Sequence, residues 1–439
     1  MKVLLVVPTA LDDAGRPIRQ RRLYLPGLTL PMLAAVTPPG VDLRFAFDSV
    51  EEVPAREPFD LVGLTGMGSG IVRAWQLARP FRERGIPVVM GGIAATLAGA
   101  ERLLEHADAV VIGEAEEVWP RVLADAAAGR LARVYEQPRQ PPIEDLPVPR
   151  YDLLDRRKLG FWLPVQATRG CPYTCRFCSV TAFFGGSHRK APIEHVVRDV
   201  RAAKARGVRH IAFLDDNIAG DFDHAARLFE ALVPEGIVWM SQGALDLAED
   251  DRLLALARRS GCRLLSFGVE STSEETLAGL GKGFNHPDRY AEAFRRVRSH
   301  GIEVSTEMII GADGDDETVF DRTHDLLMEN RIPAPRIHIL TPVPGTALWR
   351  ELEAEGRIVS RDFAGFTGGK VVFRPRRLDP AALQAGYWRL YERLFTWRAI
   401  AHRLGENRAG LGPLMRAFIA GVNLHYRRHV AHRICPGIV

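Results

Sequence analysis

The sequence predicts an α/β fold with three parts: an N-terminal doubly wound parallel sheet, a partial (βα)6 TIM-like barrel and a C-terminal, mainly helical region. Two observations predict this architecture. Short apolar runs alternate with amphipathic helical patterns through most of the chain, as parallel sheets require. The alternation changes its cadence after a proline-rich interval, and strand patterns vanish after about residue 375. The predicted boundaries are 1–132, 133–160 (linker), 161–355 and 356–439.

The first part contains five predicted strands: Lys2–Val7, Leu43–Phe47, Asp60–Thr65, Pro87–Met90 and Ala109–Ile112. Helical patterns at 71–84 and 96–105 separate the last three strands. Glycines in Gly66–Gly70, Gly91–Gly92 and Gly113–Glu116 follow these strands, at the edge where doubly wound sheets bind ligands. Tight turns also need glycine, so this pattern alone is weak evidence for a binding site.

The linker is predicted from prolines at 138, 141, 142, 147 and 149, which prevent regular structure. The barrel that follows contains six predicted strands: Leu163–Ala167, His210–Leu214, Ile237–Ser241, Arg263–Val269, Glu303–Ile310 and Arg336–Leu340. In such a barrel we expect the catalytic groups at the carboxyl ends of the strands. The basic stretch His425–His429 is interpreted as a solvated helix face.

Composition narrows the class of protein. The 58 basic and 54 acidic residues give a formal charge of +4, which offers little reason to expect a nucleic-acid partner. Five cysteines, three of them clustered, favour a reducing cytoplasm over a disulfide framework. The apolar start of the chain is interpreted as a buried strand and not as a signal peptide. No apolar run is long enough to span a membrane, so a soluble protein is expected.

The most informative motif is the C-x3-C-x2-C run formed by Cys171, Cys175 and Cys178. Three thiolates on one short loop can hold three irons of a cubane [4Fe-4S] cluster and leave the fourth iron open to an outside ligand. Zinc is the alternative, but structural zinc usually takes four ligands in two separated pairs. Cys262 and Cys435 are far away in sequence and are interpreted as single core or surface cysteines.

This spacing, with the aromatic Phe177 just before the last cysteine, resembles the signature of radical S-adenosylmethionine (SAM) enzymes. The resemblance implies that the open iron binds the amino and carboxylate groups of SAM. Reduction by an external electron donor of the flavodoxin or ferredoxin type then cleaves SAM to a 5′-deoxyadenosyl radical, which takes a hydrogen atom from the substrate. The protein itself supplies positioning and excludes water.

Up to about residue 355 the order of parts resembles the radical SAM subfamily with an N-terminal cobalamin-binding domain. The stretches that carry this resemblance are Val88–Gly92, Val111–Glu117, Leu280–Phe284 and Leu340–Thr346. One feature departs from the pattern. Cobalamin domains with an axial imidazole have an Asp-x-His-x-x-Gly loop, whereas this chain has no histidine before His106. The domain either binds cobalamin without that ligand or is a retained scaffold beside the active site.

The resemblance also implies SAM contacts at the strand ends. Asp216, after the second barrel strand, is the residue expected near the SAM amine, although Asp215, Asp216 or Asn217 can equally cap a helix. Glu270 and Ser271 end the fourth strand, where the family hydrogen-bonds the SAM ribose.

The adenine of SAM is expected at the end of the fifth strand. Ile310 and Gly311 match the adenine-binding turn of the family, with glycine permitting a close backbone approach. Phe177 is expected to pack on the adenine as well.

Four polar residues are candidates for catalysis: Asp215, Gln242, Glu307 and His338. The last three lie within or beside otherwise apolar strands, where a polar side chain costs free energy unless it is paired. Each taken alone is more simply a residue that faces solvent or a helix end, and His338 can also be a satisfied core histidine. Together they predict a polar cup for a small hydroxylated or aminated substrate.

Three functions are compatible with these residues. The preferred one is a cobalamin-independent radical SAM enzyme, for example a dehydratase that deoxygenates a diol in antibiotic-type natural-product biosynthesis. The absence of histidine from residues 1–105 is its warrant. The alternative is a cobalamin-dependent radical SAM methyltransferase or cyclase. An iron–sulfur sensor or scaffold is disfavoured, because SAM-type strand ends accompany the cysteines. The substrate and the oligomeric state do not follow from the sequence.

Overall fold

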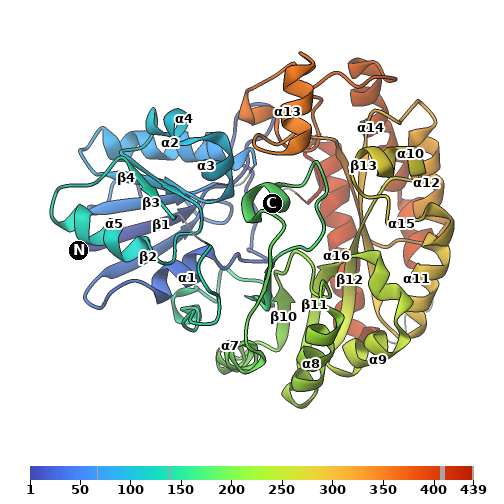
Figure 1. The fold of residues 1–439 in the computed structure, drawn as a ribbon, viewed down its shortest axis with the longest axis horizontal. Helices are drawn as coiled ribbons and strands as arrows, with labels where there is room; N and C mark the ends of the chain where they lie inside the picture. The colour runs from blue at the N-terminus through green and yellow to red at the C-terminus, as the bar shows by residue number, and fades with distance from the viewer. Residues whose placement is uncertain (67, 138–139, 406–410, 438–439) are drawn as a thin grey trace.

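A computed structural model describes the chain except for residues 67, 138–139, 406–410 and 438–439. Met67 of the glycine-rich stretch and Pro138 of the linker therefore lie outside the described residues. The predicted α/β fold is confirmed: two six-stranded sheets, parallel throughout, lie side by side (Figure 1). In the helices that the structure describes, none is both long and apolar enough to cross a bilayer.

The first sheet has the strand order β2-β1-β3-β4-β5-β6. Its strands are β1 (Lys2–Val7), β2 (Asp42–Phe47), β3 (Leu61–Thr65), β4 (Val88–Gly91), β5 (Ala109–Ile112) and β6 (Val134–Glu136). Strand order reverses between β1 and β3, and ligands of doubly wound sheets bind at such a switch point. Strand β6 lies inside the predicted linker, so the sheet extends beyond the expected boundary at residue 132.

Alternation along the first sheet creates two cores. On β1, Val3 and Leu5 belong to one core while Leu4 and Val6 belong to the other, as a period of two requires. Five helices cover the two faces: α1 (Thr29–Ala35) and α5 (Trp119–Ala127) on one, and α2 (Gly70–Arg82), α3 (Ile93–Ala98) and α4 (Ala100–Leu104) on the other.

The second sheet has the order β14-β13-β12-β11-β10-β7, so its six strands follow one another as in a barrel that is left open. The strands are β7 (Trp162–Val165), β10 (His210–Phe213), β11 (Val238–Gly243), β12 (Cys262–Glu270), β13 (Glu303–Ile310) and β14 (Pro335–Ile339). The intervening helices are α7 (Ile193–Ala205), α8 (Phe222–Leu232), α9 (Asp251–Arg259), α10 (Glu274–Gly279), α11 (Tyr290–Ser299) and α12 (Val319–Glu329). Side-chain caps from Asp221, Asp250 and Ser273 start α8, α9 and α10.

The cysteine run lies between the two strands of an antiparallel hairpin that the sequence did not indicate. The hairpin pairs β8 (Thr168–Gly170) with β9 (His188–Lys190), and α6 (Ser179–Phe184) lies between its strands. Helix α6 packs against α3 of the first domain. The segment that carries the cysteines therefore crosses between the two sheets (Figure 1).

The remaining helices are α13 (Ala347–Ala354), α14 (Pro380–Leu394), α15 (Trp397–Leu404) and α16 (Gly412–Ala431). Helix α16 fills part of the space that the open barrel leaves inside. Its residues Met415 and Ile419 are buried against Trp162, Ala212 and Leu264 from three strands of the sheet. The C-terminal region is thus an integral part of the barrel core.

A buried network of ion pairs joins the two domains. Arg169, on β8, is 7 % exposed, and its Nη1 and Nη2 atoms lie 2.5 Å from Glu114 Oε1 and 2.6 Å from Glu116 Oε1. Arg189, on β9, places Nη2 2.7 Å from Glu114 Oε2. Both glutamates follow β5. We call the ion pairs of Arg169 and Arg189 with Glu114 and Glu116 the ionic latch. The latch joins the carboxyl edge of the first sheet to the hairpin that encloses the cysteine run.

Removing one partner of a buried pair leaves an uncompensated charge, so Glu114→Ala should destabilise the protein by about 3–5 kcal/mol. Chemical and thermal unfolding measure the effect. The neighbouring Glu117 is exposed, so Glu117→Ala is the matched control and should stay within about 0.5 kcal/mol of wild type. Equal stabilities of the two variants would show that the latch contributes nothing.

Candidate active site

Asp215, which follows β10, accepts hydrogen bonds from the segment that precedes the cysteine run. Ala167 N–H donates to both carboxylate oxygens at 3.2 Å, and Thr168 Oγ1 donates to Oδ1 at 2.7 Å. The side chain is fully buried, and burial raises its pKa to about 7. We expected Asp215 among the catalytic residues. The structure instead places it beneath the loop, where it positions the backbone that leads to Cys171.

The three thiols of the run differ in their exposure to solvent. Cys175 is buried, whereas Cys171 and Cys178 are half-buried. Burial raises the pKa of all three, that of Cys175 to about 11. Cys178 N–H donates to Cys175 O at 3.2 Å and closes the loop on itself. Thiols held in this way become thiolates when a metal displaces their protons.

Zinc and an iron–sulfur cluster require different distances between the sulfur atoms that bind them. A single zinc ion binds sulfur at about 2.3 Å, which requires its sulfurs to lie roughly 4 Å apart. Within the described part of the chain, no set of three Cys, His, Asp or Glu ligand atoms within 4.8 Å of one another includes the cysteines. A cubane instead binds each thiolate at a different iron.

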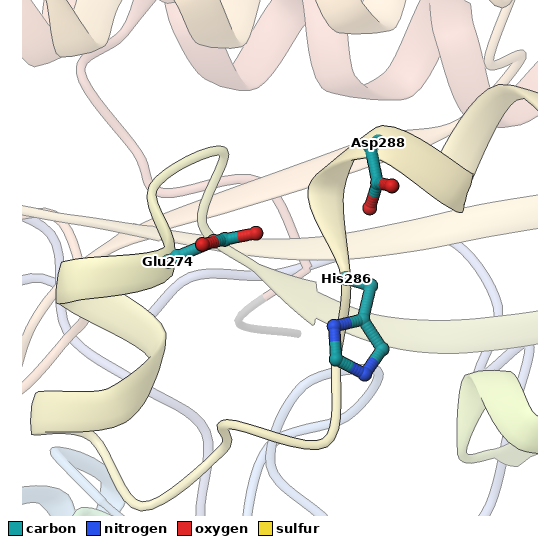
Figure 2. Close-up of side chains that lie close together, drawn as sticks. All are labelled: Glu274, His286 and Asp288. Carbon is teal, nitrogen blue, oxygen red and sulfur yellow. The ribbon is translucent and has the colours of Figure 1, made fainter.

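In the described part of the chain, a group of three side chains away from the cysteines does bring its ligand atoms within 4.8 Å of one another. Figure 2 shows Glu274, His286 and Asp288, which come from α10 and from the turn that leads toward α11. All three side chains are exposed to solvent. Exposed carboxylates often gather without an ion, so we assign no metal to this group.

Asp216 lies directly beside the cysteines. Gly170 N–H donates to Asp216 Oδ2 at 3.0 Å, and burial raises the pKa of the half-buried carboxyl group. Its negative charge helps to raise the pKa of Cys171 and Cys178, so it is close to both. Asp216 thus accepts a hydrogen bond from the backbone just before Cys171, and its role toward SAM stays a prediction.

Glu270 ends β12 in an unusual conformation. Its backbone φ is +65°, a left-handed value that costs free energy for a non-glycine residue. The carboxylate is buried and pairs with Lys282, whose Nζ lies 2.7 Å from Oε1. Ser271, also expected to contact SAM, is 1 % exposed and accepts a hydrogen bond from Ser273 N–H at 3.1 Å. Ser271 therefore shapes the turn after Glu270.

The turn after β13 lies against helix α14. Gly311 has φ +90°, and a Cβ there would lie 2.5 Å from Leu383 of α14. Its N–H donates to Asp315 Oδ2 at 2.9 Å. The Ile310 side chain is fully buried. Phe177 packs against the apolar cluster at the ends of β13 and β14, so it faces the strand end where the adenine was expected.

The predicted polar cup is partly assembled. His338 Nε2 lies 3.6 Å from Glu307 Oε2, and Ser266 Oγ donates to Glu307 Oε1 at 3.2 Å. Glu307 also pairs with Arg336, which was not among the site residues expected from the sequence. Arg336 precedes His338 by two residues on β14, so strand periodicity puts both on one face. Gln242 is exposed on β11 and has no recorded side-chain contact with this group.

A cavity adjoins the far side of His338. It has a volume of about 480 Å³, and its walls include Leu11, Asp13, Lys370, Trp388, Arg433 and Cys435. Cys435 Sγ lies 3.6 Å from His338 Nδ1, so one wall of the cavity touches the polar group in the barrel. Lys370 Nζ and Asp13 Oδ1 are 2.7 Å apart and join the two domains at this point. The volume is in the range typical of small-molecule sites.

Known proteins resemble the chain over different lengths. Residues 165–327 match the radical SAM superfamily. Bacteriochlorophyllide d C-12(1)-methyltransferase of Chlorobaculum tepidum is 28 % identical over 386 residues, which cover 86 % of this chain and 84 % of that protein. The C-8(2)-methyltransferase of the same organism is 25 % identical, with 93 % and 92 % covered.

Solved structures share the fold of both domains. The radical SAM methyltransferase TsrM from Kitasatospora setae, with cobalamin and a [4Fe-4S] cluster bound, gives a TM-score of 0.69 at 17 % identity, covering 98 % of this chain and 99 % of that one. The cobalamin-dependent radical SAM enzyme OxsB gives 0.68 at 14 % identity, with 98 % and 71 % covered.

Residues 165–327 therefore form a radical SAM domain, and the expected resemblance to that superfamily is confirmed. Its N-terminal domain has the fold of the cobalamin-binding-like domains of that superfamily. The radical SAM domain implies a [4Fe-4S] cluster and SAM as cofactors.

We expect Cys175→Ala to abolish SAM cleavage and to remove the visible charge-transfer absorption of the cluster. Anaerobically reconstituted wild type should contain about four irons per chain, because each thiolate holds one iron of the cubane. Iron analysis and the visible spectrum check both points. Cys262→Ala, which changes a buried thiol at the start of β12, should retain the iron. Full iron loading and SAM turnover in Cys175→Ala would defeat the ligand assignment.

Proposed function

We propose that this protein is a cobalamin-dependent radical SAM methyltransferase. The observation that carries the proposal is the likeness over both domains to proteins named as methyltransferases, with 86 % of this chain aligned to the first and 93 % to the second. The sequence favoured a cobalamin-independent dehydratase, with the methyltransferase as its alternative. The comparisons favour that alternative.

Cobalamin fits the carboxyl edge of the first sheet. The strand order reverses between β1 and β3, and the turns after β3, β4 and β5 begin with Gly66, Gly92 and Gly113. Helix α3, which follows Gly92, is largely half-buried and packs against α6 behind the cysteine run. We propose that these turns and α3 would hold the corrin. When bound, cobalamin would supply a carrier for a methyl group on its way from SAM to the substrate.

The missing axial histidine is consistent with this proposal. Residues 1–105 contain no imidazole, so the cofactor would be held by backbone and apolar contacts without a histidine ligand. This chain then relies on the shape of the domain interface for affinity. The ion pairs between Arg169 and the two glutamates after β5 would hold the two domains together at that interface.

The residues at the strand ends receive roles in SAM binding. Asp216 would accept a hydrogen bond from the SAM amine, and Glu270 would accept one from the ribose. Phe177 would form an apolar wall for the adenine beside the backbone of Ile310 and Gly311. The burial of Asp216 and Glu270 favours these roles, since a charge-assisted hydrogen bond is stronger away from water.

The substrate would lie against Glu307 and His338. The cavity beyond Cys435 offers an approach to this group from the surface. The relatives are named for substrates as different as bacteriochlorophyllides, hopanoids and a cytidylyl phosphonate, so likeness alone selects no substrate. Electrons would come from a flavodoxin or ferredoxin type of donor in a reducing, cytoplasmic setting.

Binding of cobalamin is the first test. Protein incubated with hydroxocobalamin and then desalted should keep the visible bands of the corrin in about one equivalent. With reductant, SAM and an accepted substrate, it should form S-adenosylhomocysteine and a methylated product only when cobalamin is present. Formation of 5′-deoxyadenosine without S-adenosylhomocysteine, unchanged by cobalamin, would instead restore the dehydratase interpretation.

Asp216→Asn should weaken SAM binding by roughly 1.5–3 kcal/mol, about 10- to 100-fold, because the amide cannot offer a charged acceptor to the amine. The amide oxygen can still accept from Gly170 N–H, so the loop and its iron content should be preserved. Titration of the anaerobic, reconstituted protein with SAM measures the affinity. Asp223→Asn, an exposed change on α8, is the control. An unchanged affinity in Asp216→Asn would move the amine contact elsewhere.

A further inference from the structure

A buried lysine lies beside the cysteine run, and the function described so far does not use it. Lys282 is 8 % exposed, and its ammonium contacts Glu270 Oε1 at 2.7 Å. Burial disfavours the charged amine, but the Glu270 carboxylate more than offsets this effect, so the pKa of Lys282 is raised. The pairing with Glu270 therefore favours the charged form of this buried side chain.

Backbone contacts fix this lysine against the cysteine run. Arg176 N–H, directly after Cys175, donates to Leu280 O at 3.0 Å. Gly281 has φ +72°, and a Cβ there would lie 3.2 Å from the Arg176 side chain and 3.6 Å from Thr174 O. The turn before Lys282 thus touches the residues on both sides of Cys175.

Aromatic contacts hold the lysine from the other side. Its ammonium lies 5.9 Å from the centre of the Phe284 ring. That ring stacks on Tyr173 of the cysteine run, with 4.0 Å between ring centres. Lys282 is consequently enclosed by the run, by Glu270 and by Phe284.

Gly268, two residues before Glu270 on β12, leaves room for the pair. A Cβ at Gly268 would lie 2.5 Å from Glu270 Oε1 and 2.6 Å from Lys282 Nζ, so only glycine is compatible with the pair as it stands. Glu270 itself adopts its left-handed φ of +65° in this arrangement. Both features indicate that the local backbone accommodates the lysine next to the thiols.

The charges around the thiols are otherwise negative. Glu270 is buried next to the run, and Asp216 accepts a hydrogen bond from Gly170 N–H directly before Cys171. A cluster on three thiolates with Asp216 and Glu270 nearby is surrounded by anions. An additional electron enters such a site more readily when a buried cation is close, because Coulomb interactions are weakly screened away from water.

We propose that Lys282 is an electrostatic tuning residue, which raises the reduction potential of the cluster by offsetting the negative charge of the thiolates and Glu270. The electron comes from an external one-electron donor, and Lys282 keeps its proton throughout. This inference depends on the iron–sulfur cluster alone and not on methyl transfer.

The test is the midpoint potential of the cluster, measured by a redox titration followed by electron paramagnetic resonance. SAM and cobalamin are left out, so the result is independent of the proposed function. Lys282→Met leaves Glu270 unpaired and should shift the potential to more negative values. Glu270→Gln should shift it to more positive values, and the double variant, which restores the local charge, should lie between the single variants and near wild type.

Two further variants make the test specific. Lys282→Arg keeps the charge and should keep a potential close to that of wild type. Lys204→Met removes the partner of Glu235 at the far end of α7 and should leave the potential unchanged. Equal potentials in wild type, Glu270→Gln and the double variant would overturn the proposal, even if Lys282→Met fails to fold. Equal shifts in Lys282→Met and Lys204→Met would likewise overturn it.

Discussion

The arrangement of the active site depends on how buried charges are paired between the two domains. Arg169 is two residues before the first cysteine, and it cannot lie away from water without anionic partners. Glu114 and Glu116, from the end of β5, meet that requirement, and Arg189 shares Glu114. The cysteine run thus takes its position from the first domain as well as from the barrel. Asp215 fixes the same run from the barrel side by accepting hydrogen bonds from its backbone.

Long buried strands were predicted well, because an apolar run leaves little freedom of interpretation. β1, β5 and β13 have the bounds expected from the sequence. The hairpin of β8 and β9 was missed, since its residues are mostly polar and its arginines find their partners in another domain. Strand β6 was missed because only Tyr135 of its three residues is buried. One buried residue just before a proline-rich stretch does not form a recognisable strand pattern. Such elements exist because of tertiary contacts and not because of local periodicity.

At the site, spacing alone was enough to find the cysteines, whereas the charge pairs required the fold. Arg336 lies directly opposite Glu307 in the register of β13 and β14, so knowledge of strand pairing would have revealed it. Lys282 pairs with Glu270 at a point where the register between β12 and β13 shifts, which local sequence patterns do not reveal. The absent histidine led the sequence interpretation away from cobalamin. That inference was weak because a domain interface can hold a large cofactor by shape, and a missing ligand removes only one of several contacts.

Helix α16 has a consequence for the order in which the molecule can form. Its residues Met415 and Ile419 fill the barrel against strands that were synthesised some 150 to 250 residues earlier. During translation the first sheet can fold as soon as it emerges, but the barrel keeps an unfilled apolar interior until the final helix leaves the ribosome. Until α16 has packed, the barrel beside the cysteine run is incomplete. A chain that ends before α16 would therefore leave these apolar side chains of the barrel strands uncovered.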